Sequence, residues 1–294
     1  MRKLQDNPFV LLVGTGLGLG LNFPLGKLAL AAGVSAPLWA AFISLGAGLA
    51  LLFLAKATGK QGVATGILRF SLTSGFLSYV MPNLLTFTVV PKIGSGLAGL
   101  MFALSPVTTA ILSLILKVWP PNRLGVAGIA LGLAGAMVVV WGKGGGAEPA
   151  GAWWLVLGLL IPCFLGVGNV YRSLAWPQEV GPILLGSLTN LAAVPFLLMI
   201  ALAMHGGIEL APLAKVPLLL VAQLVSSTLM FTMFFRLQQI GGPTYLSQIG
   251  YVAAAVSLFA GVAFLGETYQ AMVWIGAAII AAGIGLSTYS TRRP

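Results

Sequence analysis

The stretch "GTGLGLGLNFPLGKLAL", from Gly14 to Leu30, has alternating glycines followed by an asparagine, a proline and a lysine inside an apolar run. Closely spaced glycines occur both in loops that cradle phosphates and in tightly packed membrane helices. A dinucleotide-binding loop requires G-x-G-x-x-G and an acid about 20 residues later. Each possible start places a leucine or a phenylalanine at the third glycine position, and no acid lies between Asp6 and Glu148. The stretch therefore predicts a membrane helix.

The composition supports the same interpretation for the whole chain. Its 294 residues are 59% hydrophobic and 7% charged, whereas ordinary globular domains carry about 25% charged residues. Apolar runs of roughly 20 residues recur throughout, which is the length of a helix that crosses a bilayer. A membrane β-barrel would show alternating segments of roughly 10 residues. The net charge of +10 is dispersed between the apolar runs, so we expect an all-α integral membrane protein in a lipid bilayer and no nucleic-acid partner.

Ten apolar segments are separated by connections too short to form a soluble domain. We expect membrane-spanning helices over Pro8–Ala31, Pro37–Ala55, Ile67–Val90, Gly94–Lys117, Leu124–Trp141, Ala152–Trp176, Pro182–Met204, Val216–Arg236, Gly242–Leu265 and Ala271–Tyr289.

A glycine-rich linker at residues 144–151 divides the chain into two predicted repeats of five helices, residues 1–143 and 152–294. An odd number of spans in each half makes the second half start on the opposite side of the membrane. Two such halves would be inverted repeats. A shift of 148 residues superposes three glycine pairs, which are Gly94 on Gly242, Gly128 on Gly276 and Gly135 on Gly283. Chance matching of common residues is the alternative explanation for these pairs.

The cations predict an orientation. With the N-terminus in the cytoplasm, the inner segments hold most of them: Arg2, Lys3, Lys56, Lys60, Arg69, Lys117, Arg123, Arg172, Arg236, Arg292 and Arg293. The outer segments hold Lys92, Lys143 and Lys215. The excess of inner cations predicts a multi-pass protein of the cell membrane with both termini cytoplasmic. Lys27, near the outer end of its helix, would extend to the membrane surface.

Ten spans in two halves with both termini inside resemble the drug/metabolite transporter superfamily, in its EamA-type branch. "LAGLMFALSPVTTAILSLIL" followed by "LGVAGIALGLAGAMVVV" is similar to the fourth and fifth helices of that family. The stretch from Gly242 to Leu286, which includes "LGE" at Leu265 to Glu267, is similar to the ninth and tenth. The opening "NFPLGKLAL" resembles the amino-acid exporters of this group, including those for aromatic amino acids.

This resemblance implies a transporter that exports small metabolites by alternating access through a central cavity. Amino acids, including aromatic and apolar ones, are the implied substrates. A proton-driven exporter of other metabolites or drugs is the alternative, followed by an intramembrane enzyme or a scaffold. No carboxylate falls inside a predicted span, and proton carriers commonly use buried Asp, Glu or His. We therefore favour a facilitator.

Polar groups that face lipid are costly, so polar helices should face a cavity. The first, third, fourth, sixth, eighth and ninth spans are the polar ones, and we expect them to line it, with the other four outside. Thr244, Ser247, Gln248 and Tyr251 follow the spacing of one helical face, although interhelical hydrogen bonding would produce the same pattern. The candidate cavity residues are Asn22, Tyr79, Asn83, Asn169, Tyr171, Gln223, Tyr245, Gln248 and Tyr251.

Proline and glycine suggest where helices bend. Pro24 cannot donate to the carbonyl of Gly20, so this pair is a candidate hinge. Pro82 and Pro106 are candidate gate residues for the same reason. The sequence offers no set of residues for metal binding, cofactor binding or catalysis. The expected site is uncharged and suits a zwitterionic amino acid. Arg172 either holds the substrate carboxylate or is an inner cation at a helix end.

Overall fold

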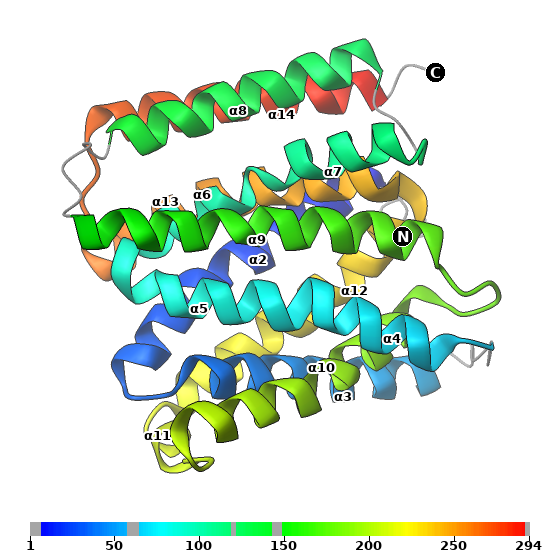
Figure 1. The fold of residues 1–294 in the computed structure, drawn as a ribbon, viewed down its shortest axis with the longest axis vertical. Helices are drawn as coiled ribbons and strands as arrows, with labels where there is room; N and C mark the ends of the chain where they lie inside the picture. Colours follow the sequence, from blue (N-terminus) through cyan, green and yellow to red (C-terminus); the bar gives the residue numbers. More distant parts are fainter. Residues whose placement is uncertain (1–6, 58–64, 119–121, 143–148, 292–294) are drawn as a thin grey trace.

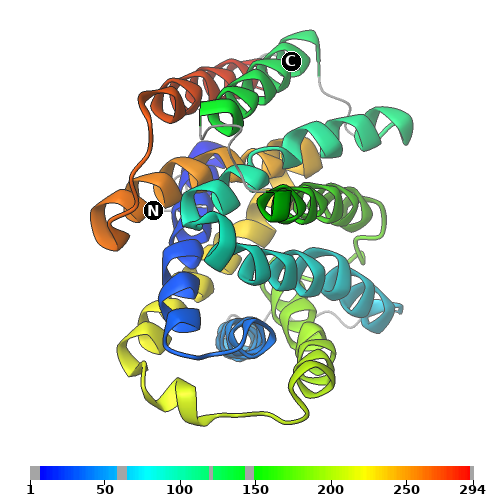
Figure 2. The same ribbon diagram turned by 60° about the vertical axis from the view of Figure 1, so that its left-hand side comes forward.

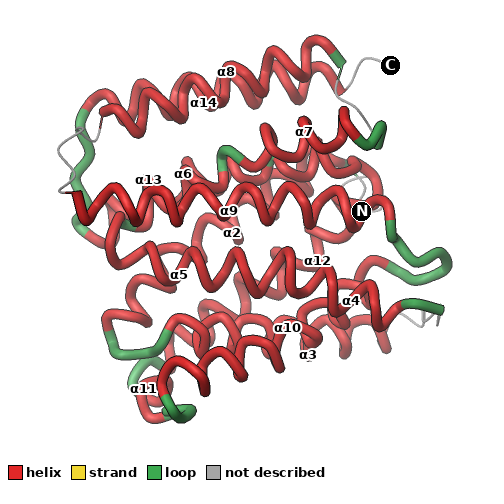
Figure 3. The backbone as a smooth tube through the Cα atoms, in the orientation of Figure 1, coloured by secondary structure: helices red, strands yellow, loops and turns green. Residues whose placement is uncertain are grey.

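The computed structural model describes residues 7–57, 65–118, 122–142 and 149–291. Throughout these residues the chain is helical, with short loops and no strand (Figure 3). The helices are α2 (Pro8–Ala31), α3 (Ala36–Ala57), α4 (Ile67–Gly75), η1 (Phe76–Val80), α5 (Met81–Ile93), α6 (Ser95–Phe102), α7 (Ser105–Ile115), α8 (Arg123–Gly142), α9 (Pro149–Leu174), α10 (Pro182–His205), α11 (Ala211–Ala214), α12 (Pro217–Ser247), α13 (Ile249–Leu265) and α14 (Ala271–Thr291).

Most predicted spans are confirmed, and their ends have local causes. The first matches α2, whose N-terminus is capped by the side chain of Asn7 accepting from the amide of Phe9 at 3.0 Å. Several helices have a proline in their first turn. An N–H at that position has no acceptor within the helix, so proline, which lacks the N–H, loses no hydrogen bond there. Left-handed glycines end others, as Gly206 does for α10 and Gly266 for α13.

The prediction of single helices for the fourth and ninth spans is corrected, because neither span is one uninterrupted helix. The fourth breaks between α6 and α7. The ninth starts at Gly242, a non-helical kink within α12, and breaks again at Gln248 before α13. The predicted stripe from Thr244 to Tyr251 therefore crosses a helix break. Gly94 and Gly242 both combine a positive φ with extended ψ at the start of these spans, a conformation that glycine adopts without a steric penalty.

The third span is also irregular. It continues to Ile93, and its middle is the π-helical turn η1. Pro82 lies just after this turn and cannot donate a backbone hydrogen bond, and a π-turn is one way for the chain to accommodate it. The amide of Met81 accordingly donates to the carbonyl of Phe76, five residues earlier.

When the helices on either side of each break are grouped together, the described helices form ten spans. Most of them run in the same general direction in the view of Figure 1, whereas α2 and α12 cross it obliquely. α8 and α14 lie together along one edge, and α3 packs against α10 at the opposite edge. The second view shows the α8–α14 pair at the same edge (Figure 2). The other spans form the body between these pairs.

The contact between α8 and α14 follows an approximate two-fold relation. A Cβ added at Gly135 would meet the carbonyl of Gly276 at 2.7 Å, and one added at Gly283 would meet the carbonyl of Gly128 at 2.7 Å. Adding 148 to Gly135 gives Gly283, and subtracting 148 from Gly276 gives Gly128, so the shift relates the first contact to the second. Since α8 and α14 are the fifth helices of their halves, this reciprocity supports two inverted repeats.

Length and composition fit a membrane environment. Six helices among the described residues are long and apolar enough to cross a bilayer, and four shorter helices are also apolar. The protein is therefore a multi-pass membrane protein. The predicted boundary between the repeats falls largely at residues 143–148, outside the described residues.

Candidate functional site

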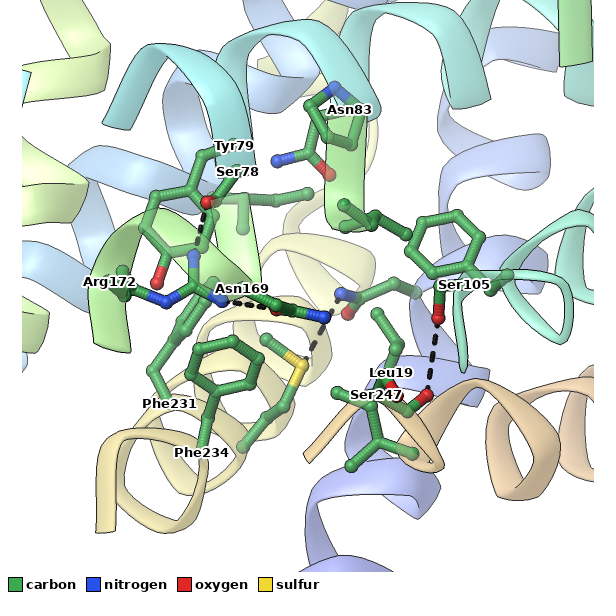
Figure 4. A pocket seen from close by; sticks show the side chains of 17 residues that line it. Leu19, Ser78, Tyr79, Asn83, Ser105, Asn169, Arg172, Phe231, Phe234 and Ser247 are labelled. Carbon is green, nitrogen blue, oxygen red and sulfur yellow. Dashed lines mark hydrogen bonds between the residues drawn. The ribbon is translucent and has the colours of Figure 1, made fainter. Parts of the chain in front are cut away.

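A central pocket lies where the broken helices meet (Figure 4). About 620 Å³ of space free of protein atoms lies within its bounds, and this volume includes open solvent. Its lining comes from the six polar spans that the sequence predicts, with Ile43 of α3 in addition. The lining residues are Leu19, Asn22, Ile43, Ser78, Tyr79, Pro82, Asn83, Phe102, Ser105, Leu165, Asn169, Arg172, Met230, Phe231, Phe234, Ser247 and Ile249.

Arg172 is the charged residue of this lining. It lies in the last turn of α9, the helix end where the sequence predicts a cation, but its side chain is 1% exposed and lines the pocket. Its Nη2 donates to Asn169 Oδ1 at 2.5 Å, and its Nε donates to Gln238 Oε1 at 3.4 Å. Its Nη1 donates to the hydroxyl of Ser78, and the guanidinium carbon lies 4.9 Å from the ring centre of Phe234. Three helices thus fix one cation at the pocket wall.

None of these partners is an anion. Within the described residues the one ion pair joins Lys27 to Glu267, and Arg172 takes no part in it. A buried ion without an opposite charge costs several kcal/mol, so such an arrangement requires a reason. Arg172 is held by neutral oxygens and faces a cavity, and the cavity can therefore accept an anionic group.

Tyr79 adds a second donor. The turn η1 places Ser78 and Tyr79 next to each other on the pocket wall. The tyrosine is 4% exposed, and its hydroxyl has no hydrogen-bond partner among the described residues. Its ring packs edge-on against Phe231, with centroids 4.9 Å apart. A buried hydroxyl without a partner is costly, which indicates that it can bond to something in the cavity.

Asn22 of α2 provides an amide to the same pocket. Its Oδ1 accepts from Gln223 Nε2 at 2.7 Å, and Gln223 also donates to the hydroxyl of Ser227 at 2.6 Å. The Asn22 Nδ2 donates to the sulfur of Met230 at 3.9 Å, and a thioether is a weak acceptor. This donor is therefore only weakly engaged by the protein.

The structure brings together four of the nine predicted cavity residues, which are Asn22, Tyr79, Asn83 and Asn169. The other five lie outside the lining. Tyr171 stacks on Phe70 with centroids 6.0 Å apart. Gln223 lies behind Asn22. Tyr245, Gln248 and Tyr251 are buried between helices.

Among the candidate hinge and gate residues, Pro82 lines the pocket, and Pro24 and Pro106 are buried in their helices. Gly20 packs against α13, where an added Cβ would meet Val256 at 2.5 Å. Sequence reasoning missed three aromatic residues of the lining, which are Phe102, Phe231 and Phe234. The spacing of Phe231 and Phe234 places them on one helical face, but such spacing is common in any apolar span.

A second polar cluster surrounds Glu267, between α13 and α14. Lys27 Nζ donates to its Oε1 at 2.5 Å, so the expectation that Lys27 extends freely to the membrane surface is corrected. At the N-terminus of α6, the amide and hydroxyl of Ser95 donate to the same oxygen at 3.1 and 2.9 Å. The Gly96 amide, at 3.4 Å, and the Tyr269 hydroxyl donate to the other. The cluster joins α2, α6 and the loop before α14.

Burial by itself raises the pKa of the Glu267 carboxyl, but the hydrogen bonds from Lys27, Tyr269 and Ser95 outweigh it and lower that pKa to about 2. The carboxylate is therefore ionised at neutral pH and fully occupied by its neighbours.

Comparison with known proteins agrees with this architecture. The family model described as "EamA-like transporter family" matches twice, over residues 8–141 and 152–289. The chain belongs to the EamA-like transporter family. The match in two repeats agrees with the two-fold relation between α8 and α14. The protein is therefore a multi-pass membrane transporter of small molecules, and its family consists of transporters rather than enzymes.

One solved structure, described as "Crystal structure of protein", matches with a TM-score of 0.71 and 20% sequence identity. The match covers 96% of this chain and 98% of that one, and it supports the fold alone. No curated protein matches the chain in a comparison of sequences.

Proposed function

We propose that this transporter exports zwitterionic amino acids, with a preference for aromatic and apolar side chains. The observation that carries the proposal is Arg172, a buried guanidinium at the pocket wall whose hydrogen-bond partners are all neutral. A guanidinium matches the geometry of a carboxylate and binds it with charge-assisted hydrogen bonds. The substrate carboxylate would supply the missing negative charge.

The rest of the lining fits the remaining parts of such a substrate. Phe102, Phe231 and Phe234 line the pocket, and the rings of Phe231 and Phe234 pack against each other. An apolar or aromatic side chain can pack on these rings. Amide oxygens, such as that of Asn83, can accept from an ammonium group. A cationic drug without a carboxylate would place its charge beside Arg172 and be repelled.

Alternating access requires helices that can rearrange, and the breaks supply candidates. Gly94 and Gly242 begin the two interrupted spans, and Pro82 and Pro106 lie where the third and fourth spans are irregular. Gly20 and Pro24 lie within α2 on either side of Asn22, and Pro24 cannot donate a backbone hydrogen bond. We propose that these positions move while the two repeats exchange the open side of the pocket, with both termini in the cytoplasm.

Transport without proton coupling is the mode that the cavity supports. None of the described lining residues is Asp, Glu or His. Glu267, the least exposed acid of the described residues, is already bonded to Lys27 and to the start of α6. We therefore propose a facilitator that moves its substrate down a concentration gradient.

Counterflow in proteoliposomes tests the proposal. Vesicles preloaded with phenylalanine should accumulate labelled phenylalanine, whereas phenethylamine, which lacks the carboxylate, should not exchange. Arg172→Gln should abolish the exchange in protein that still elutes as a folded species. Arg236→Gln, which changes an arginine outside the pocket lining, should retain it. Phenethylamine exchange, or phenylalanine exchange by Arg172→Gln, would contradict the assigned role of Arg172.

A further inference from the structure

Arg172 poses a problem whenever the substrate is absent. The guanidinium has five N–H donors, and its described hydrogen bonds go to three neutral oxygens. The alternating-access cycle includes a step in which the empty transporter returns. In that step a lone positive charge would remain buried with no opposite charge, at a cost of several kcal/mol.

We propose that a small inorganic monovalent anion, of the size and charge of chloride, binds at Arg172 when the amino acid is absent. The inference deepens the proposed function, because the anion would occupy the place of the substrate carboxylate. The two ligands would then compete for one site, and the anion would neutralise Arg172 during the return step.

The pocket wall offers donors with unused capacity. The hydroxyl of Tyr79 lies beside the guanidinium of Arg172 in Figure 4, and both residues line the pocket. That hydroxyl has no partner in the described part of the chain, although the residue is 4% exposed. The Asn22 Nδ2 has only the sulfur of Met230, at 3.9 Å. Guanidinium, phenol and amide N–H or O–H groups all donate to anions.

The charges favour one negative charge over two. Arg172 is the one cation of the described lining, and the lining holds no acid. A monovalent anion neutralises it, whereas a divalent phosphate or sulfate would leave one negative charge buried without a partner, which is costly. A cation would meet the positive guanidinium. The site therefore suits chloride, or bromide as its experimental substitute.

Thermal unfolding of the purified full-length protein in detergent gives a direct test with bromide as the probe. Sodium bromide replaces the sodium salt of a bulky sulfonate at constant ionic strength, with no amino acid present. A ligand that binds only the folded state raises the unfolding temperature. We expect a saturable rise, and the bromide concentration at half-effect gives the apparent Kd.

Two tyrosine variants separate a site from a general salt effect. Tyr79→Phe removes the unpaired hydroxyl and should weaken bromide binding about tenfold, which corresponds to one good hydrogen bond. Tyr171→Phe makes the same change on a ring that stacks on Phe70 outside the lining, and it should leave the bromide Kd unchanged. A non-saturable rise, or equal Kd values in the two variants, would overturn the inference.

Competition links the anion to the substrate site. Bromide should raise the apparent Kd of labelled phenylalanine without reducing the number of sites, and a fall in site number at constant Kd would contradict a shared site. Phenylalanine transport without saturable bromide binding would refute the anion site alone. Saturable, Tyr79-dependent bromide binding without amino-acid transport would refute the proposed function and leave the anion site standing.

Discussion

Arg172 and Glu267 are two charges largely withdrawn from solvent, and their surroundings differ. Glu267 accepts hydrogen bonds from a lysine, a serine, a tyrosine and two backbone amides. Arg172 donates to an asparagine, a glutamine and a serine, and no acid in the described part of the chain pairs with it. Glu267 lies in a loop at the end of the spans, whereas Arg172 lies at the wall of the central pocket.

The difference separates a charge that stabilises the fold from one that serves a ligand. The partners of Glu267 neutralise it and fix the start of α6 against α2, and this leaves little capacity for a ligand. The partners of Arg172 orient it without neutralising it. Preorganised but unsatisfied groups are what a binding site needs, because the ligand then supplies the missing interaction.

A carboxylate placed next to Arg172 would give it the opposite charge that Glu267 already has. We expect this change to have the largest effect on transport. Asn169→Asp is nearly isosteric and places a carboxylate at the atom that already accepts from Arg172 at 2.5 Å. The internal carboxylate would replace that of the substrate, so we expect the apparent affinity for phenylalanine to fall on the order of a hundredfold. Counterflow at matched amounts of reconstituted protein measures the change.

Gln239→Glu is the matched control. It converts an amide into an acid three residues from an arginine, since Arg236 Nη1 donates to Gln239 Oε1 at 2.6 Å, but it does so on an exposed surface. We expect wild-type counterflow. If both variants lost affinity equally, added negative charge rather than occupation of Arg172 would explain the result.

Removing the charge of Glu267 should lower the stability of the fold and leave substrate affinity unchanged. Glu267→Gln leaves Lys27 and the start of α6 without their anion, and breaking a fully buried pair costs about 3–5 kcal/mol. Lys27 keeps 32% of its side chain exposed, so a cost of about 1–3 kcal/mol is expected. The unfolding temperature should fall, while the surviving folded protein should retain its affinity for phenylalanine. An unchanged unfolding temperature would contradict a structural role for the cluster.

Asn22 lies between Glu267 and Arg172 in how far its neighbours satisfy it. Its oxygen accepts from Gln223, but its amide donor has only the sulfur of Met230. Asn22→Ala should weaken the apparent affinity for substrate about tenfold, the equivalent of one good hydrogen bond. Ser226→Ala, which removes a side-chain bond between α12 and the backbone of α2, is the control for helix packing. Wild-type kinetics in Asn22→Ala at equal membrane expression would exclude Asn22 from the site.

The sequence predicts the spans and the polar helices because both follow from the free-energy cost of exposing polar groups to lipid. A span needs roughly 20 apolar residues, and amides such as Asn22 and Asn169 are not stable against lipid. The aromatic residues of the lining could not be predicted, because a phenylalanine such as Phe231 or Phe234 has the same sequence pattern whether it faces lipid or a cavity. The pairing of Lys27 with Glu267 joins residues 240 positions apart, and only the packed fold brings them together.

The break at Gln248 shows why local patterns failed near the ninth span. The spacing from Thr244 to Tyr251 assumes one continuous helix, but α12 ends at Ser247 and α13 begins at Ile249. The first break falls at Gly242, where the sequence predicts the start of the ninth span, and a proline follows it. No residue type marks the second break, at Gln248. Tyr251 was consequently expected at the cavity, although it lies in the packed interface where α13 meets Gly132 of α8.

The smallest expected effect is the pH dependence of the Glu267 cluster. The pKa of Glu267 is lowered from 4.5 to about 2, so the folded protein holds this carboxyl ionised at pH values where the unfolded chain protonates it. Stability from this group is therefore fully present above about pH 4.5 and is lost as the pH falls toward 2.

The difference in unfolding temperature between wild type and Glu267→Gln isolates this contribution. Between pH 7 and pH 5 the difference should be constant, because Glu267 is ionised in both the folded and the unfolded wild-type chain. Below pH 4.5 it should shrink steadily, since the unfolded wild-type chain gains a proton that the folded one excludes. Unfolding followed by circular dichroism in detergent at half-unit steps from pH 7 to pH 3 measures it. A difference that stayed constant down to pH 3 would show that the Glu267 carboxylate is not what its neighbours stabilise.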